Sequence, residues 1–176
     1  MSFFDEQIAI GWTKWRPVGR VYVAAGPRGV MAVKMGPLGE SEAATLIWAM
    51  FHIPTILDQR ATSDVIRQLD AYFRGELWEF DVPLDLRTET AFQHMVLTYI
   101  QRIPAGRTMT YGEIAAALGD PERAMAVGQA LAANPIPLLI PCHRVIGADG
   151  MMVGYSGYGG VETKAALLRH EGALLL

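Results

Sequence analysis

The single cysteine of this chain, Cys142, constrains its fold more than any other residue. One thiol excludes an internal disulfide framework and any zinc site built from several thiolates. The four histidines also lie far apart in the sequence, with no spacing typical of metal ligands. We therefore expect no metal and no cofactor. The chain must fold around a hydrophobic core, and 51% of its 176 residues are apolar.

The composition also bears on where the protein works and what it binds. No run of about 18 apolar residues is present, so no membrane span is expected. The N-terminus carries Asp5 and Glu6 and lacks the basic start of a signal peptide. We expect a cytoplasmic protein whose thiol stays reduced. The formal net charge of −3 argues against a protein that holds nucleic acid by charge alone.

The first half of the chain is predicted to mix strands and helices. Two apolar runs, Val21–Ala25 and Val30–Met35, flank a Gly-Pro-Arg-Gly turn and predict a hairpin. Apolar residues at helical spacing predict an amphipathic helix between Thr62 and Gly75. The apolar segment Leu46–Ile53 is compatible with a buried strand or a helix, because its periodicity does not distinguish the two.

The second half is predicted to be mostly helical. Thr90 and Gln93 have the spacing of a capping box at the start of one helix. The stretches TYGEIAAALG and DPERAMAVGQALAANP predict two short helices across a tight turn, a candidate helix-turn-helix. Asp120 is the expected N-cap of the second helix, with Pro121 in its first position. An extended segment separates the halves and predicts domains at residues 1–85 and 86–176.

The stretch IPCHRVIG sets Cys142 beside His143 inside an apolar run. A lone cysteine in such a run is usually a small core residue, whereas a thiol with a base nearby is a candidate nucleophile. In an extended backbone successive side chains alternate, so only a bend at Pro141 or an intervening water brings the imidazole to the sulfur. Two later acids, Glu162 and Glu171, are candidates to orient that imidazole.

Two features near this stretch have both a structural and a functional interpretation. Asn134 can end a helix as its C-cap, or it can bridge the helix pair to the cysteine segment. The second helix of the pair has small residues on one side, Ala124, Ala126 and Gly128. Such a face packs tightly on a neighbouring helix, or it enters a DNA groove.

These residues together resemble a known family. The sequence TYGEIAAALGDPERAMAVGQALAANPIPLLIPCHRVIGADG, followed by GYSGYGG and ALLRHEG, resembles the O6-alkylguanine-DNA alkyltransferases, or methylated-DNA–protein-cysteine methyltransferases. The likeness runs from about Phe92 to Gly172. It implies an α+β fold. A small N-terminal α/β domain with an antiparallel, ribonuclease H-like sheet supports a mostly helical C-terminal domain with a winged helix-turn-helix, which binds DNA and accepts the alkyl group.

The resemblance implies a DNA-repair enzyme that acts once. O6-alkylguanine, with O4-alkylthymine as a second candidate substrate, would be flipped out of double-stranded DNA, and its alkyl group would pass irreversibly to Cys142. His143 would act through a water as the base, and Glu171 would hold His143. Asn134 would sense the state of the sulfur. The protein would act as a monomer without a membrane partner.

The resemblance also implies a base pocket and a DNA-contact surface. Tyr111 would press on the phosphate beside the lesion and help to turn the nucleotide out. Tyr155 and Ser156 would line the pocket, with backbone groups of Val145 and Ile146 nearby. The second helix of the pair would lie in the minor groove. Its contact surface would comprise Tyr111, Arg123, Ala124, Met125, Ala126 and Gly128.

Two departures from the family pattern affect these expectations. The family has arginine where this chain has Met125, and Arg123 lies about 200° away around the helix axis, so it does not replace that arginine. Met125 can still act as an apolar wedge between bases. The loop GYSGYGG is two residues longer than the shortest family form, which leaves Tyr155 and Tyr158 as alternatives for the pocket.

The charge of the second half is a third consideration. From Thr88 onward the sequence has six basic and seven acidic side chains. Binding to DNA is therefore expected to be modest, with a small salt dependence, and to depend on the fit in the groove.

Other functions fit parts of this pattern. One is a protein of the same fold that binds and flags alkylated bases without transfer, although relatives of that type lack the cysteine. A helix-turn-helix transcription regulator is disfavoured because such fusions carry extra cysteine-bearing domains. A thiol hydrolase is disfavoured because no oxyanion hole is evident.

Overall fold

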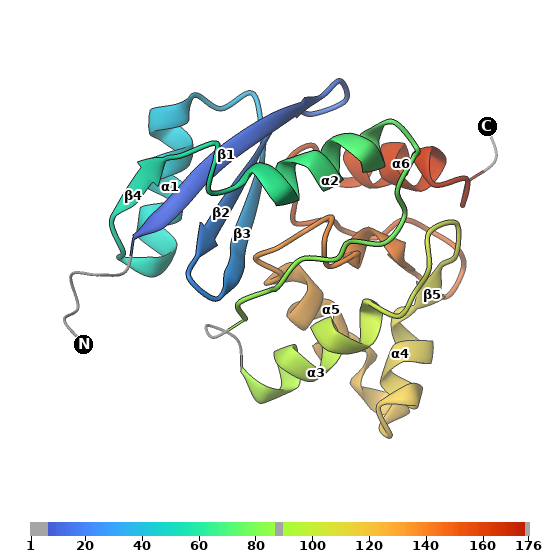
Figure 1. Cartoon of the computed structure of the whole chain (residues 1–176). Helices are drawn as coiled ribbons and strands as arrows, with labels where there is room; N and C mark the ends of the chain where they lie inside the picture. The colour runs from blue at the N-terminus through green and yellow to red at the C-terminus, as the bar shows by residue number, and fades with distance from the viewer. Residues whose placement is uncertain (1–6, 87–89, 175–176) are drawn as a thin grey trace. The chain divides into compact units, whose positions relative to one another are not determined.

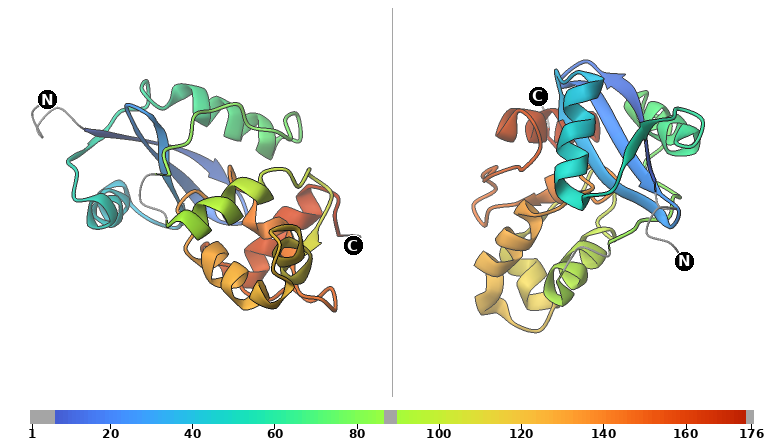
Figure 2. Two further views of the ribbon diagram at one scale, coloured as in Figure 1. Left: turned by 90° about the horizontal axis from the view of Figure 1, so that it is seen from below. Right: turned by 90° about the vertical axis from the view of Figure 1, so that its left-hand side faces the viewer.

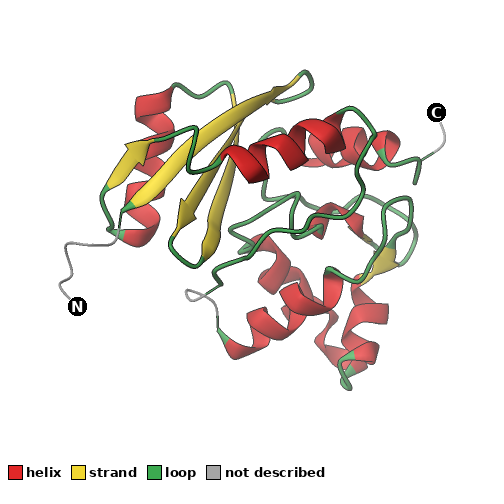
Figure 3. Ribbon diagram, in the orientation of Figure 1, coloured by secondary structure: helices red, strands yellow, loops and turns green. Residues whose placement is uncertain are grey.

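The computed structural model describes residues 7–86 and 90–174, and the chain divides into two compact units, Met1–Asp85 and Leu86–Leu176 (Figure 1). The predicted α+β fold is confirmed. A mainly antiparallel sheet lies in the N-terminal unit, and the C-terminal unit is mostly helical (Figure 3). Every helix in these described ranges is too short or too polar to span a lipid bilayer.

The N-terminal unit is built on a four-stranded sheet. β1 (Ile8–Trp15), β2 (Gly19–Gly26) and β3 (Gly29–Gly36) pair antiparallel, which confirms the predicted hairpin as β2 and β3. β4 (Thr55–Leu57) adds parallel to β1, so the strand order is β3-β2-β1-β4. The hairpin turn requires glycine, because Gly29 has a φ of +136° and a Cβ there would lie 2.3 Å from a backbone oxygen.

α1 (Glu40–Phe51) decides the structure of the segment Leu46–Ile53, for which the sequence allowed a strand or a helix. The helix continues to Phe51, and His52 ends it in the left-handed conformation, with a φ of 54°. Ala43 and Ile47 are the buried positions of the helix, and they join the core on one face of the sheet.

α2 (Ser63–Phe73) covers the opposite face of the sheet (Figure 2) and confirms the predicted amphipathic helix. Gly11 of β1 permits the close approach, because a Cβ at that position would lie 1.9 Å from the Thr62 hydroxyl oxygen. That hydroxyl donates to the backbone oxygen of Asp58 and does not cap the helix. Thr62 occupies the N-cap position, but its side chain accepts no hydrogen bond from the first turn of α2.

The extended segment before the unit boundary is attached to the sheet. The Val30 N–H donates to the Pro83 carbonyl at 2.9 Å, and the Asp85 N–H donates to the Val30 carbonyl at 2.8 Å. The buried Asp85 carboxylate also pairs with Arg28 at 3.3 Å. These bonds make residues 83–85 an integral part of the N-terminal unit.

Two capping boxes start the first helices of the C-terminal unit. At α3 (Ala91–Ile100), the Thr90 hydroxyl accepts from the Gln93 N–H at 3.2 Å, and the Gln93 side chain accepts from the Thr90 N–H at 2.9 Å. This confirms the predicted box. Thr110 begins α4 (Tyr111–Ala117) in the same way, so the position of the first α4 residue is fixed by local sequence.

The helix after α4 begins later than predicted. Asp120 and Pro121 start a short 3-10 helix, η1 (Pro121–Arg123), in which the Asp120 carboxylate accepts from the Glu122 N–H. The α-helix α5 (Ala124–Ala132) follows it and packs against α4 as the expected helix pair. The predicted cap is therefore right for the turn but wrong for the α-helix, because a tighter turn forms first.

A short parallel ladder brings the cysteine segment to the start of α4. β6 (Val145–Ile146), directly after the cysteine turn, pairs with β5 (Met109–Thr110), directly before α4. The last helix, α6 (Gly160–His170), is followed by Glu171, which forms its C-cap. Residues from five separate stretches of the C-terminal unit thus meet around Cys142.

Candidate active site

Cys142 opens a 3-10 turn, η2 (Cys142–Arg144), and does not lie in an extended strand. The Arg144 N–H donates to the Pro141 carbonyl at 3.0 Å, which closes the turn. Side chains in such a turn diverge without the strict alternation of a strand. The three side chains are buried, with exposed fractions of 6% for Cys142, 0% for His143 and 5% for Arg144.

His143 and Arg144 share one carboxylate, that of Glu171. The His143 Nε2 donates to Glu171 Oε1 at 2.9 Å. The Arg144 Nε donates to Oε2 and its Nη2 to Oε1, both at 2.9 Å. Of the two acids that the sequence offered to orient the imidazole, the structure brings Glu171 to it and leaves Glu162 exposed.

The imidazole has one nitrogen available for proton transfer. Because a carboxylate only accepts hydrogen bonds, Nε2 carries a proton in the pair with Glu171. Nδ1 is buried and has no hydrogen-bond partner among the described residues. Burial lowers the pKa of His143, as do Arg144 and Lys164, against the opposing effect of Glu171. A neutral imidazole with a free Nδ1 lone pair is the form that these contacts favour.

Burial also keeps the thiol of Cys142 neutral before the reaction. Burial raises the pKa of Cys142, while a hydrogen bond from Asn134, the charge of Lys164 and nearby backbone N–H groups lower it. Burial is the largest of these effects, so the sulfur needs a proton acceptor before it can act as a nucleophile.

Asn134 clamps the chain that leads to the cysteine. Its Nδ2 donates to the Ile140 carbonyl at 3.0 Å, and its Oδ1 accepts from the Ile136 N–H at 3.0 Å. The C-cap of α5 is Ala133, so Asn134 is not the helix cap. Between these two bonds Leu138 has a φ of +77°, an unfavourable value for a residue with a side chain. The bridging interpretation of Asn134 is the one that the geometry supports.

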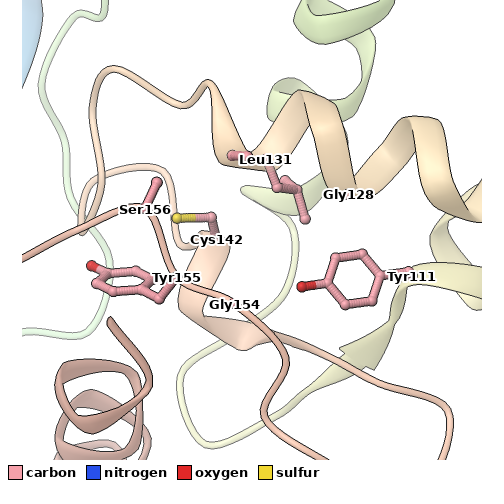
Figure 4. A pocket seen from close by; sticks show the side chains of 8 residues that line it. Tyr111, Gly128, Leu131, Cys142, Gly154, Tyr155 and Ser156 are labelled. Atoms are coloured by element: carbon pink, nitrogen blue, oxygen red, sulfur yellow. The ribbon is translucent and has the colours of Figure 1, made fainter. Parts of the chain in front are cut away.

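A pocket of about 280 Å³ opens beside the thiol (Figure 4). Figure 4 shows Cys142 between Tyr155 on one side and Tyr111 on the other, with the Tyr111 hydroxyl directed into the pocket. Its lining is formed by Tyr111, Gly128, Leu131, Ala132, Cys142, Gly154, Tyr155 and Ser156.

The structure gathers most, but not all, of the expected pocket residues. Tyr111, Tyr155 and Ser156 line the pocket, whereas Val145 and Ile146 form β6 and are not among the lining residues. Their main chains pair with Met109 and Thr110 of β5. The sequence did not predict Leu131, Ala132 and Gly154, which complete it.

The glycine-rich loop before α6 directs Tyr155 inward (Figure 4). The Tyr155 hydroxyl is buried with no partner among the described residues, and burial raises the pKa of that phenol well above its ordinary value. Tyr158 in the same loop is 49% exposed. Gly159 has a φ of +78°, and a Cβ there would lie 2.4 Å from the Thr163 hydroxyl oxygen. Glycine at that position lets the loop turn sharply into α6.

Lys164 is the functional candidate that sequence reasoning missed. It is only 1% exposed, and its Nζ donates to the carbonyls of Val153 and Gly154 at 3.3 and 3.2 Å. The Tyr111 hydroxyl donates to the same Val153 carbonyl at 2.9 Å. One signal was available, because Lys164 lies seven residues before Glu171 and therefore on the same, largely apolar, face of α6.

The outer surface of α5 is at least partly exposed to solvent, in contrast to the buried groups around Cys142. Met125 is 79% exposed, while Ala124, Ala126 and Gly128 are half-buried. The Arg123 guanidinium lies 4.2 Å from the ring centroid of Phe92. An Asp120 oxygen lies 4.0 Å from the same guanidinium. Arg123 is thus held against α3 and its own turn.

The site contains no arrangement suited to a metal. In residues 7–86 and 90–174, no group of three or more histidine, cysteine or acidic side chains is placed to hold an ion. The histidine at the site is committed to Glu171. The chemistry available is that of a buried thiol, a neutral imidazole and a pocket with apolar and hydroxyl groups.

Two family models match the chain. The model described as "6-O-methylguanine DNA methyltransferase, DNA binding domain" matches residues 91–173. The model described as "6-O-methylguanine DNA methyltransferase, ribonuclease-like domain" matches residues 15–86. Between them they account for nearly all of both units.

Curated relatives and solved structures agree with these models. The chain is 53% identical over 114 residues to the methylated-DNA–protein-cysteine methyltransferase of Mycobacterium bovis, covering 65% of this chain and 67% of that protein. It is 50% identical over 107 residues to the protein of that name in Methanosarcina acetivorans, covering 61% of this chain and 67% of the relative. A crystal structure of Mycobacterium tuberculosis OGT in complex with DNA matches with a TM-score of 0.77 at 38% identity, covering 94% of this chain and 93% of the other.

Proposed function

This chain belongs to the 6-O-methylguanine DNA methyltransferase family and acts in DNA repair by alkyl transfer, and we propose that Cys142 accepts the alkyl group in one irreversible turnover. The observation that carries this assignment is the position of the thiol. The thiol lies at a pocket of about 280 Å³. It is next in sequence to His143, whose Nε2 is hydrogen-bonded to the buried carboxylate of Glu171.

The transfer is a displacement at the alkyl carbon of O6-alkylguanine. A bond forms between the Cys142 sulfur and that carbon while the bond from the carbon to O6 breaks. The thiol gives up one proton, and the released guanine takes up one, so charge balances. The product is a thioether, which no simple step reverses, and each protein molecule therefore acts once.

His143 accepts the thiol proton at Nδ1, through a water, because Nε2 is already bonded to Glu171. The geometry favours this route, since a buried thiol with a raised pKa does not ionise unaided at neutral pH. Asn134 reports the state of the sulfur to the backbone, because its side chain hydrogen-bonds the Cys142 thiol and also joins the carbonyl of Ile140 to the N–H of Ile136.

The pocket receives a base that has left the duplex. The O6 edge of guanine is inaccessible within the helix, so the nucleotide is flipped out at a cost of a few kcal/mol. Tyr155 and Ser156 contact the flipped base, and Tyr111 presses on the neighbouring phosphate. O6-alkylguanine is the primary substrate, and O4-alkylthymine is a candidate second substrate.

The protein binds DNA, and α5 is the element that enters the minor groove. Support comes from the small side chains of its outer face, which permit a close approach, and from the 79% exposure of Met125. Met125 acts as an apolar wedge beside the flipped base. The contact surface comprises Tyr111, Arg123, Ala124, Met125, Ala126 and Gly128.

The protein works as a monomer in the cytoplasm. The thiol, its base and the pocket all come from residues of the C-terminal unit, so a second copy supplies nothing to the site. A reducing cytoplasm keeps Cys142 as the free thiol that the reaction needs. The N-terminal unit supports the C-terminal unit, which carries DNA binding and alkyl acceptance.

Intact-mass measurement tests the assignment directly. The protein is incubated with an equal amount of duplex DNA carrying one O6-methylguanine. A gain of one methyl group on wild type, mapped to Cys142 and lost in Cys142→Ala, is the expected result. No gain in mass at stoichiometric DNA would overturn the proposal. A base-flagging protein would instead bind the modified duplex and keep its mass, and the buried thiol at the pocket disfavours that function.

A further inference from the structure

Arg144 is a buried cation at the site for which the alkyl-transfer chemistry has assigned no role. Resting on the proposed function above, we propose that Arg144 is a positioning residue that holds Glu171 and thereby keeps His143 in its proton-accepting form. Its guanidinium does not face the pocket, whose lining does not include it. Any effect on transfer must therefore pass through the groups that it touches.

The guanidinium binds the carboxylate in a fixed orientation. Two parallel hydrogen bonds, from Nε to Oε2 and from Nη2 to Oε1, are both 2.9 Å long. Such a bidentate pair fixes the plane of the carboxylate as well as its position. Nη1 donates to the Ile103 carbonyl at 2.6 Å, which fixes the guanidinium from its other side. Arg144 is 5% exposed, so water does not compete for these bonds.

Glu171 needs this partner because of where it lies. It is the C-cap of α6, where the helix dipole disfavours a negative charge. It is also buried, which by itself raises the pKa of a carboxyl group; the hydrogen bonds from His143 and Arg144 reverse that effect and hold the pKa of Glu171 well below its ordinary value. The carboxylate consequently stays ionised, and Nε2 of His143 keeps its proton.

The shared oxygen links Arg144 to the basicity of the imidazole. Glu171 Oε1 accepts from His143 Nε2 and from Arg144 Nη2 at equal distances of 2.9 Å. A carboxylate bonded to the imidazole alone would strongly favour the doubly protonated imidazolium, which has no lone pair for the thiol proton. Arg144 offsets the carboxylate charge, so the imidazole stays neutral and Nδ1 remains able to accept.

The titratable and charged groups around His143 either act on its protonation or give it a proton. From α6 it meets Glu171 and the cation of Lys164, and from its own turn it meets Arg144 and the Cys142 thiol. The connection between α3 and β5 contributes the Ile103 carbonyl, which Arg144 occupies. Arg144 and Lys164 both lower the pKa of His143, and Arg144 also shares the hydrogen-bonded carboxylate with it.

The test compares wild type with two variants. Arg144→Gln removes the positive charge, whereas Arg144→Lys keeps a positive charge but cannot form the two parallel hydrogen bonds to Glu171. Single-turnover methyl transfer to Cys142 is measured by mass from pH 5 to 9, and the His143 ring is titrated by NMR in the free protein. The acid limb of the rate profile and the His143 titration should both move up by about one pH unit or more in Arg144→Gln. At one unit below the new midpoint, that variant is about tenfold slower than its own plateau. Arg144→Lys should show a smaller move in the same direction.

A purely structural role predicts a different result. Both variants would then lose rate by the same factor at every pH, with the acid limb and the His143 titration unmoved, and that outcome overturns the inference. If Arg144→Gln does not fold, as judged by near-UV circular dichroism, Arg144→Lys decides by the same criterion. Wild type that gains no methyl group would instead refute the proposed function, while the NMR titration would still judge the role of Arg144.

Discussion

The two units of this protein bury polar groups for different purposes. Nine polar or charged residues are buried in the described parts of the chain, and only three of them belong to the N-terminal unit. Those three, Thr62, Gln68 and Asp85, each fasten a loop or strand. Gln68, for example, holds the backbone of Asp81 with bonds of 2.9 and 2.8 Å.

The C-terminal unit buries the other six, and three of them, Asn134, His143 and Lys164, act on the Cys142 thiol. Its buried groups include a lysine, an arginine, a histidine and a glutamate, which are costly to remove from water even when paired. A core of apolar residues would stabilise the unit at lower cost. The C-terminal unit thus gives up stability to hold a neutral imidazole and several charged groups around the site, whereas the N-terminal unit buries one charged side chain, Asp85, among the described residues.

The largest effect that would sharpen this contrast is expected for Glu171→Gln. This change leaves Arg144 buried without its carboxylate and should destabilise the protein by about 3–5 kcal/mol. Transfer should fall on the order of 100-fold, because His143 loses the group that orients it. Denaturant unfolding and single-turnover transfer measure the two effects.

The matched control is Asp85→Asn in the N-terminal unit, where a buried carboxylate pairs with Arg28. It should cost about 1–3 kcal/mol of stability and leave the transfer rate of the folded protein unchanged. If the control slows transfer as much as Glu171→Gln does, the division of labour between the units is wrong.

A second prediction concerns the buried cation on α6. Lys164→Met removes the charge that lowers the pKa of Cys142, so that pKa should rise and transfer at neutral pH should slow by about tenfold. Stability should change little, because the lost contacts are two long hydrogen bonds to the carbonyls of Val153 and Gly154 and a position 6.0 Å from the centroid of the Tyr111 ring. Arg169→Met, an exposed cation of the same helix, is the control and should leave the transfer rate as in wild type.

The buried charged groups of the C-terminal unit should also make the stability of the protein depend on pH. The pKa of Glu171 and that of His143 both lie below their ordinary values in the folded protein. A group with a lowered folded pKa contributes stability above its unfolded pKa and loses it as the pH falls. Stability should therefore decline below about pH 6.5 through His143 and further below about pH 4.3 through Glu171. Urea unfolding of wild type and Glu171→Gln from pH 8 to 3 checks this, and a variant with the same acid slope as wild type would contradict it.

The smallest effect is expected on the outer face of α5. Met125→Arg should tighten DNA binding or speed transfer and steepen the salt dependence of binding by about one unit of slope. Stability should be unchanged, because the side chain is 79% exposed. Binding of a duplex with O6-methylguanine at several salt concentrations measures the effect. Met151→Arg, at a position 61% exposed in a loop, is the control for charge alone, and an equal gain there would mean that α5 has no special role.

Local sequence sufficed for elements whose signals lie within a few residues. The Thr90–Gln93 capping box and the hairpin around Gly29 could be predicted because each depends on short-range hydrogen bonds or a required backbone angle. The segment Leu46–Ile53 could not be assigned, because an apolar run fits a strand or a helix until its neighbours are known. The 3-10 turn before α5 was missed for a related reason, since a capping aspartate and a proline suit either kind of helix.

By itself the sequence determined the chemical identity of the site: one thiol beside one imidazole, with small residues on the helix nearby and a family motif around them. Only the tertiary structure decided how these groups are paired. It brought Glu171, and not Glu162, to His143, directed Tyr155 inward, left Val145 and Ile146 out of the pocket wall, and buried Lys164 where its charge acts on the thiol. The reason is physical, because the cost of burying a charge and the partner that offsets it are set by distances between residues far apart in the chain.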